Sequence, residues 1–229
     1  MAEREKEALE EEEDEPVLAY MFDAASAKEV RSLEVLGRSV CYCCVAESGS
    51  ETCLQSGHSV WAATRHLVAY LGTQAVENSD VFELGCGVGV VGLCCACVLR
   101  ARRVICTDRD VGALELCESG IGENKLEDGI VSTARFCFGD LWDGAKYDWC
   151  VASDVVYDKN MACGLCKSAA SVLKDEGTFL LAASFDLGGA TFDRELRDAC
   201  RHAGLSEPAL VFKSDDGTQI WRSKRLAFS

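Results

Sequence analysis

The chain has 229 residues and 48% of them are hydrophobic, which suits one sizeable domain with a packed core. It contains no run of about 18 apolar residues, and its amino-terminal residues lack the basic-then-apolar pattern of a signal peptide. We therefore expect no membrane span and a soluble protein of the cytoplasm or nucleus.

The formal net charge of −15 is unevenly spread along the chain. Residues 1–15 hold nine acidic residues against Arg4 and Lys6, and we expect them to form a solvated, disordered tail. The rest of the chain carries a charge of −8. This charge disfavours nucleic acid as a partner and favours a basic protein surface.

Most of the 15 cysteines lie inside apolar runs, where a thiol acts as a small hydrophobic core residue. Cys163 and Cys166 have the two-residue gap of a zinc knuckle, but they lie in a helical pattern without a second pair. We expect reduced thiols and no metal site.

Residues 16–229 are predicted to form a single domain, with a hairpin and a helix over about 30–72. Apolar and polar residues alternate between Val30 and Glu47 around Gly37, which predicts a β-hairpin. Residues 53–57 predict a turn. Residues 59–71 have apolar side chains at helical spacing, and Gly72 is expected to end that helix.

Short apolar runs alternate with helical patterns from about residue 80 to the end of the chain. The expected strands are residues 81–84, 103–107, 131–138, 147–153, 177–184, 210–213 and 218–223. Helices are expected up to about residue 99 and over residues 111–124, 159–173 and 191–203. Repeated strand–helix units predict an α/β fold, a Rossmann-like, mostly parallel seven-stranded sheet with helices on both faces. The last two strands are joined too tightly for a crossover helix, so the last strand should be antiparallel.

A glycine-rich turn, Glu83-Leu84-Gly85-Cys86-Gly87-Val88-Gly89, stands where the first expected strand of the sheet feeds a helix. Glycines there let the backbone lie against a ligand, and the helix amino terminus presents free N–H groups. Asp108 ends the next strand, where a carboxylate can accept hydrogen bonds from both hydroxyls of a ribose. The spacing G-x-G-x-G differs from that of dinucleotide binders, and no Walker lysine follows. An adenosine-containing ligand is therefore predicted.

At these residues the chain resembles the class I, seven-β-strand S-adenosylmethionine-dependent methyltransferases, from about residue 30 to its end. Three further matches resemble the protein-lysine methyltransferase group within that class: Val60-Trp61-Ala62-Ala63, Leu141-Trp142, and Ser153-Asp154-Val155-Val156-Tyr157, which carries the Asp-x-x-Tyr motif. One departure is Ala62, where members of the group usually carry Pro or Asp.

The resemblance implies S-adenosyl-L-methionine as cofactor and a role for each matched residue. Trp61 would line the methionine side, Asp108 would take the ribose, and Ser153 would contact the cofactor beside the reaction centre. The cofactor-binding residues so implied are Trp61, Glu83, Gly85, Cys86, Gly87, Gly89, Asp108, Asp140, Leu141, Trp142 and Ser153, with residues 140–142 flanking the adenine.

The resemblance also implies that Asp154 and Tyr157 are the catalytic residues and face a protein substrate. Asp154 would hold the incoming lysine amine, and the ring of Tyr157 would wall its channel. Simpler roles remain open for some residues. Trp61 and Trp142 can be core aromatics, Asp154 can cap the following helix, and Glu83 can fix the glycine loop.

The expected function is methylation of a lysine side chain on a protein, by a monomeric enzyme. Arginine or histidine methylation, or a non-catalytic cofactor-binding module, are the alternatives. Enzymes that methylate base amines carry Asn/Asp-Pro-Pro-aromatic after the fourth strand, whereas the only prolines here are Pro16 and Pro208. This absence argues against a nucleic acid substrate.

Overall fold

The structure is a computed structural model that describes residues 28–45, 56–157, 161–185 and 188–227. The predicted acidic tail, most of the turn predicted at residues 53–57 and the start of the helix predicted from residue 159 lie outside these ranges. The strand–helix alternation predicted from about residue 80 lies almost wholly inside them.

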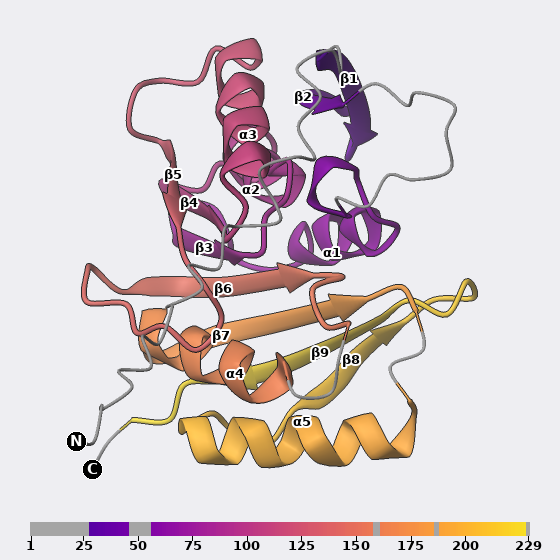
Figure 1. Cartoon of the computed structure of the whole chain (residues 1–229), viewed down its shortest axis with the longest axis vertical. Helices are drawn as coiled ribbons and strands as arrows, with labels where there is room; N and C mark the ends of the chain where they lie inside the picture. The colour runs from indigo at the N-terminus through magenta and orange to yellow at the C-terminus, as the bar shows by residue number, and fades with distance from the viewer. Residues whose placement is uncertain (1–27, 46–55, 158–160, 186–187, 228–229) are drawn as a thin grey trace, which may run out of the picture.

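Seven strands form one sheet with the order β5-β4-β3-β6-β7-β9-β8 (Figure 1). Neighbouring strands from β5 to β7 are parallel, and β9 runs antiparallel to both β7 and β8. The strands are β3 (Asp80–Leu84), β4 (Arg103–Asp108), β5 (Val131–Arg135), β6 (Tyr147–Ser153), β7 (Leu173–Ala183), β8 (Ala209–Lys213) and β9 (Gln219–Lys224). The predicted fold class, including the antiparallel last strand, is confirmed.

Helices cover both faces of this sheet (Figure 1). They are α1 (Ala63–Leu71), α2 (Val90–Cys97), α3 (Val111–Glu123), α4 (Met161–Val172) and α5 (Ala190–Ala203), with a short 3-10 helix η2 (Ser56–His58) before α1. The first three helices pack on one face, and α4 and α5 pack on the other. Successive strand residues serve opposite faces, so Val81 joins the first core and Phe82 the second.

The amino-terminal hairpin is confirmed, with β1 (Lys28–Val35) paired to β2 (Arg38–Val45). Leu36 and Gly37 both have positive φ, as a tight hairpin turn requires. The amide side chain of Asn124 accepts from the Cys41 N–H at 3.0 Å and donates to the Cys41 carbonyl at 2.7 Å. This pairing, like that of a neighbouring strand, fastens the hairpin to the end of α3.

The helix predicted over residues 59–71 begins later, at Ala63. Its first N–H donates to a carboxylate oxygen of Asp154, 91 residues away, at 3.0 Å. Gly72 ends the helix as predicted, although it keeps a right-handed conformation with φ −63°. A cap supplied from a distant segment is invisible to helical periodicity, so the prediction placed the start too early.

Two strands also differ from their predicted bounds. β5 ends at Arg135 instead of residue 138, because the chain turns away through reciprocal hydrogen bonds between Cys137 and Asp140. β7 begins at Leu173, directly after α4, and its pairing with β6 shifts register between Tyr147 and Trp149. The added residues form an irregularity that the apolar pattern does not reveal.

Cys94, Cys95, Cys106 and Cys150 are fully buried, as their apolar surroundings predict. All cysteines in the described ranges are free thiols. No described helix has the length and apolar character needed to cross a membrane. Within the described ranges, no three His, Cys, Asp or Glu side chains are grouped so that they could hold a metal ion.

Candidate active site

A cavity of about 770 Å³ opens at the carboxyl-terminal ends of β3, β4, β5 and β6. Open parallel sheets place their ligands at this edge, because the loops that follow the strands converge there. The cavity brings together most of the residues that the sequence predicted for the site. Those that line it are Trp61, Glu83, Gly85, Cys86, Gly87, Asp108, Ser153 and Tyr157.

The glycine loop after β3 forms the floor of the cavity. Gly85 and Gly87 have φ of 67° and 52°, a region that L-residues with side chains rarely adopt. A side chain at Gly87 would also lie 2.7 Å from the carbonyl oxygen of Gly57. The loop therefore accepts only glycine at this position, since η2 packs directly on its backbone. Gly89 caps α2 and does not line the cavity.

Asp108 ends β4 beside this loop. One carboxylate oxygen accepts from the Gly87 N–H at 2.9 Å, and the other accepts from the Asp110 N–H at 3.0 Å. A carboxylate oxygen has two lone pairs, so each oxygen keeps one for a further donor. The backbone N–H groups thus fix the Asp108 carboxylate in place and leave it able to accept hydrogen bonds from a pair of hydroxyls.

Glu83 lies in the cavity wall but is almost fully buried, and its Oε2 accepts from the Gly92 N–H at 2.9 Å. Gly92 lies in the first turn of α2, so Glu83 satisfies one of the helix's free donors. Burial raises the pKa of Glu83 to about 8. The carboxyl therefore fixes the glycine loop to its helix, the simpler role that the sequence left open, while it also faces the cavity.

Ser153 ends β6 and lines the cavity. Its hydroxyl is buried, and no hydrogen-bond partner for it exists among the described residues. A buried polar group without a partner costs roughly 1–3 kcal/mol, so such groups are usually satisfied by something. The hydroxyl is placed to bond a polar group of a ligand.

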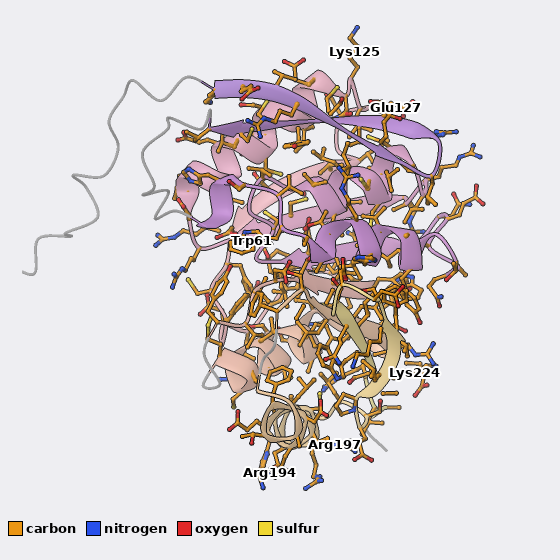
Figure 2. The ribbon with its side chains drawn as sticks, turned by 90° about the vertical axis from the view of Figure 1, so that its right-hand side faces the viewer. Trp61, Lys125, Glu127, Arg194, Arg197 and Lys224 are labelled. Atoms are coloured by element: carbon orange, nitrogen blue, oxygen red, sulfur yellow. The ribbon has the colours of Figure 1, made fainter. Side chains whose placement is uncertain are left out.

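Trp61 and Tyr157 lie at the mouth of the cavity, with their ring centroids 6.4 Å apart and the rings tilted by 54°. They are 38% and 55% exposed, so neither is a core aromatic. Figure 2 shows Trp61 between the layer of the hairpin and α1 and the layer of α4. The mouth therefore presents aromatic surface to whatever approaches the cavity.

Three residues predicted to flank the adenine do not reach this cavity. Trp142 packs edge-on against Phe82, with centroids 5.1 Å apart, and its indole N–H donates to the Ala145 carbonyl. Leu141 is 66% exposed, and Asp140 is bound in the turn after β5. The cofactor role of residues 140–142 therefore stays a prediction, since none of the three lines the cavity and Trp142 is a partly buried aromatic that packs against the core on the α4 face.

Beyond β5 the cavity is lined by Arg135, Phe136, Cys137 and Phe138, which no motif in the sequence singled out. Arg135 pairs with Asp108 across β4 and β5, so these residues lie level with the Asp108 carboxylate. Strand register was the signal that could have found them. It was missed because β5 was expected to continue to residue 138.

Asp154 also differs from its predicted role, because it is 1% exposed and does not line the cavity. Its Oδ2 accepts from the Ala63 N–H, and its Oδ1 accepts from both the N–H and the hydroxyl of Ser184. It does cap a helix, as the alternative role proposed, but the helix is α1 and not the one that follows it.

His58 is another residue to which the sequence assigned no chemistry. It is buried, and its Nε2 lies 3.2 Å from Oδ2 of Asp110, the residue that caps α3. The contact joins η2 to the loop after β4 and so closes one side of the cavity. Only the pairing of a distant turn with Asp110 reveals this role.

Curated relatives are similar to parts of this chain. Protein N-lysine methyltransferase METTL21A from Xenopus tropicalis is 34% identical over 103 residues, which cover 43% of this chain and 46% of that protein. EEF1A lysine methyltransferase 3 from Mus musculus is 29% identical over 155 residues, covering 65% of each chain. Protein N-terminal and lysine N-methyltransferase EFM7 from Cryptococcus neoformans is 30% identical and covers 53% of this chain and 45% of its own length. The chain spans about half the length of most of these relatives.

Solved structures share the fold at lower identity. The T. thermophilus 16S rRNA methyltransferase RsmC, in complex with AdoMet and guanosine, has a TM-score of 0.64 and 16% identity over 87% of this chain and 51% of that one. Magnesium protoporphyrin IX methyltransferase from Synechocystis, with bound SAM, has a TM-score of 0.56 and 18% identity over 71% of this chain and 77% of that one. These likenesses support the fold alone.

The sequence profile of the lysine methyltransferase family matches residues 45–185. Every residue that lines the cavity, from Gly57 to Met161, lies inside this match. The chain therefore belongs to the lysine methyltransferase family.

Proposed function

We propose that this protein transfers a methyl group from S-adenosyl-L-methionine to the side-chain amine of a lysine on a protein substrate. The observation that carries the proposal is the cavity itself. It brings together a glycine loop, a backbone-fixed carboxylate, an unpartnered hydroxyl and the rings of Trp61 and Tyr157, all inside the family match. The names of the curated relatives agree with this reaction.

The residues present fit this cofactor. Asp108 would accept the ribose hydroxyls, and Gly85 and Gly87 would let the cofactor lie on the loop backbone. The Ser153 hydroxyl would find in the cofactor the partner that no described residue supplies. When bound, S-adenosylmethionine supplies a methyl group on a positively charged sulfur, which is readily displaced by an amine.

The chain's own work is to position the amine and to keep water away from it. Trp61 and Tyr157 stand at the mouth, where their ring faces can hold an alkylammonium group. The lysine amine must lose its proton before it attacks, because its ordinary pKa is about 10.4. Asp154 already accepts three donors and does not face the cavity, which supports water at the mouth as the proton acceptor.

We further propose that the partner is a protein with a basic surface around the target lysine. The chain carries a net charge of −15, which attracts such a surface and repels phosphate backbones. A monomeric enzyme of the cytoplasm or nucleus remains the expectation from the sequence.

The test uses the full chain, S-adenosylmethionine with a labelled methyl group, and cell lysate as the source of acceptors. Acid hydrolysis of labelled protein should yield methyl-lysine, and Asp108→Ala should lose most of the labelling. Label recovered only as methyl-arginine, as methyl-histidine or in RNA would overturn the lysine assignment. Cofactor binding without any labelled product would indicate a non-catalytic module.

A further inference from the structure

The carboxylate of Asp154 is the most heavily used polar group near the site. It lies in the loop after β6 with φ 54°, a left-handed conformation that is uncommon for a residue other than glycine. It accepts from the Ala63 N–H at 3.0 Å, from the Ser184 N–H at 2.6 Å and from the Ser184 hydroxyl at 3.0 Å. These bonds hold the unusual backbone conformation in place.

The two residues that supply these donors, Ala63 and Ser184, each lie within two residues of an aromatic residue in the sequence. Ala63 begins α1 two residues after Trp61, and Ser184 immediately precedes Phe185 at the end of β7. Asp154 itself is three residues before Tyr157. One buried carboxylate therefore joins the three backbone segments that carry Trp61, Tyr157 and Phe185.

The three rings form a continuous group, which we call the aromatic mouth. Tyr157 stacks on Phe185, with centroids 6.2 Å apart and an interplanar angle of 11°. Trp61 lies 6.4 Å from Tyr157 on the cavity side. Phe185 does not line the cavity, so it acts by supporting the ring of Tyr157 from behind. Neither the sequence motifs nor the resemblance singled out Phe185.

We propose that Asp154 is a positioning residue that sets the spacing of the aromatic mouth, and that Phe185 is the support that orients Tyr157 toward an alkylammonium ligand. The inference rests on the proposed function, because the ligand is taken to be the lysine side chain. It differs from the catalytic role that the sequence implied for Asp154, because here Asp154 acts through Trp61 and Tyr157 and transfers no proton.

The arrangement explains why a carboxylate is needed at this position. All three donors present hydrogens, and an aspartate carboxylate offers acceptor lone pairs on both of its oxygens without presenting a donor of its own. In Asp154→Asn the amide oxygen can keep the two Ser184 bonds, but the amide nitrogen then faces the Ala63 N–H. This substitution should release the start of α1, and with it Trp61, while leaving the Ser184 side in place.

The experiment follows the indole N–H signals of the full chain by NMR during titration with tetramethylammonium, with S-adenosylhomocysteine present. The Trp61 signal is identified by its loss in Trp61→Phe. In the wild type this signal should shift and saturate. Asp154→Asn and Phe185→Leu should each raise the half-saturating concentration by about fivefold, the size of one exposed cation–π contact.

Asp80→Asn is the matched control, because Asp80 is also a buried aspartate but lies at the opposite edge of the sheet. It should leave the titration unchanged. Hydrogen exchange supplies a second readout, since the Ala63 amide should exchange faster in Asp154→Asn and at the wild-type rate in Asp80→Asn. Unchanged titration in both Asp154→Asn and Phe185→Leu, or unchanged exchange at Ala63, would overturn the proposal.

Methyl transfer separates a positioning residue from a proton acceptor. In Asp154→Asn the apparent KM for lysate protein should rise, and the pH dependence of kcat/KM should keep its shape. Loss of the ascending limb of that profile would make Asp154 the base and overturn the proposal. Neither the titration nor the exchange requires turnover, so an inactive wild type that still binds tetramethylammonium would reject the proposed function alone.

Discussion

The acidic side chains at the two ends of the parallel strands have different kinds of hydrogen-bonding partner. At the amino-terminal edge, Asp80 is surrounded by the cationic side chains of Arg102, Arg103 and Lys174, at 2.7, 3.2 and 3.4 Å. At the carboxyl-terminal edge, Glu83, Asp108 and Asp154 accept chiefly from backbone N–H groups. None of the described cations forms a salt bridge with these three acids.

The difference appears in the pKa values of the two regions. Burial acts to raise the pKa of Asp80, but hydrogen bonds and charges from Arg102, Arg103 and Lys174 outweigh it and lower the pKa overall. Glu83 has no such cations, so burial raises its pKa to about 8. One edge is therefore neutralised within the protein and serves stability. The other edge keeps acceptors and a hydroxyl for a ligand.

The largest expected effect is that of Asp154→Ala, which removes the acceptor of three donors at a buried position. We expect the free energy of unfolding to fall by roughly 3–5 kcal/mol, as measured by urea denaturation. Asp140→Ala is the control, because its carboxylate accepts at the exposed surface, and it should cost less than about 1 kcal/mol. Equal losses in the two variants would contradict the structural role of Asp154.

The second prediction concerns pH and Glu83. The raised pKa means that the folded chain keeps a proton that the unfolded chain releases above about pH 4.5. This contribution to stability is present below pH 4.5 and is lost as the pH rises through 8. Relative to the wild type, Glu83→Gln should therefore gain about 3 kcal/mol of unfolding free energy between pH 5 and pH 8.

Denaturation of both proteins at several pH values measures this gain. The Asp80→Asn variant should change in the opposite direction with pH. The lowered pKa of Asp80 gives the wild type stability that is lost as the pH falls into the acid range, so the free energy of unfolding of Asp80→Asn should gain on that of the wild type as the pH falls. A difference between Glu83→Gln and the wild type that does not change with pH would show that Glu83 is ionised in the folded chain.

The third prediction compares the edges as ligand sites. Asp108→Ala should weaken binding of S-adenosylhomocysteine by about 1–3 kcal/mol, since it strands the ribose hydroxyls and frees the Gly87 N–H. Asp148→Ala, at the amino-terminal edge, should leave the affinity unchanged. Calorimetry on both variants makes the comparison. A similar loss of affinity in the two would remove the distinction between the edges.

The smallest effect is expected for Arg102→Gln. The Arg102 side chain is mostly exposed, and Arg103 and Lys174 would still accompany Asp80. The free energy of unfolding should fall only slightly, and the loss should shrink in high salt, because the exposed pair is screened by solvent and ions. A loss as large as that of Asp154→Ala would mean that the network at Asp80 depends on this one pair.

Several features of the site could be predicted from the sequence because their signals are local. The glycine loop and Asp108 each follow a short apolar run, so the ends of β3 and β4 were found with their ligand-facing residues. Ser153 and Tyr157 came from a motif that resembles a known group. The cavity lining after β5 could not be predicted in the same way, because it depends on where β5 stops: Arg135 to Phe138 line the cavity and residues 140–142 do not.

Local periodicity and turn chemistry thus determined the strand–helix order, the hairpin and the loop that floors the cavity. Only the tertiary structure decided that Trp142 packs against the core, that Asp154 is buried, and that Phe185 stands behind Tyr157. Asp154 meets donors that are 91 and 30 residues away. Such partners are chosen by strand order and register across the sheet, and a single segment of sequence carries no record of which distant backbone its side chain will meet.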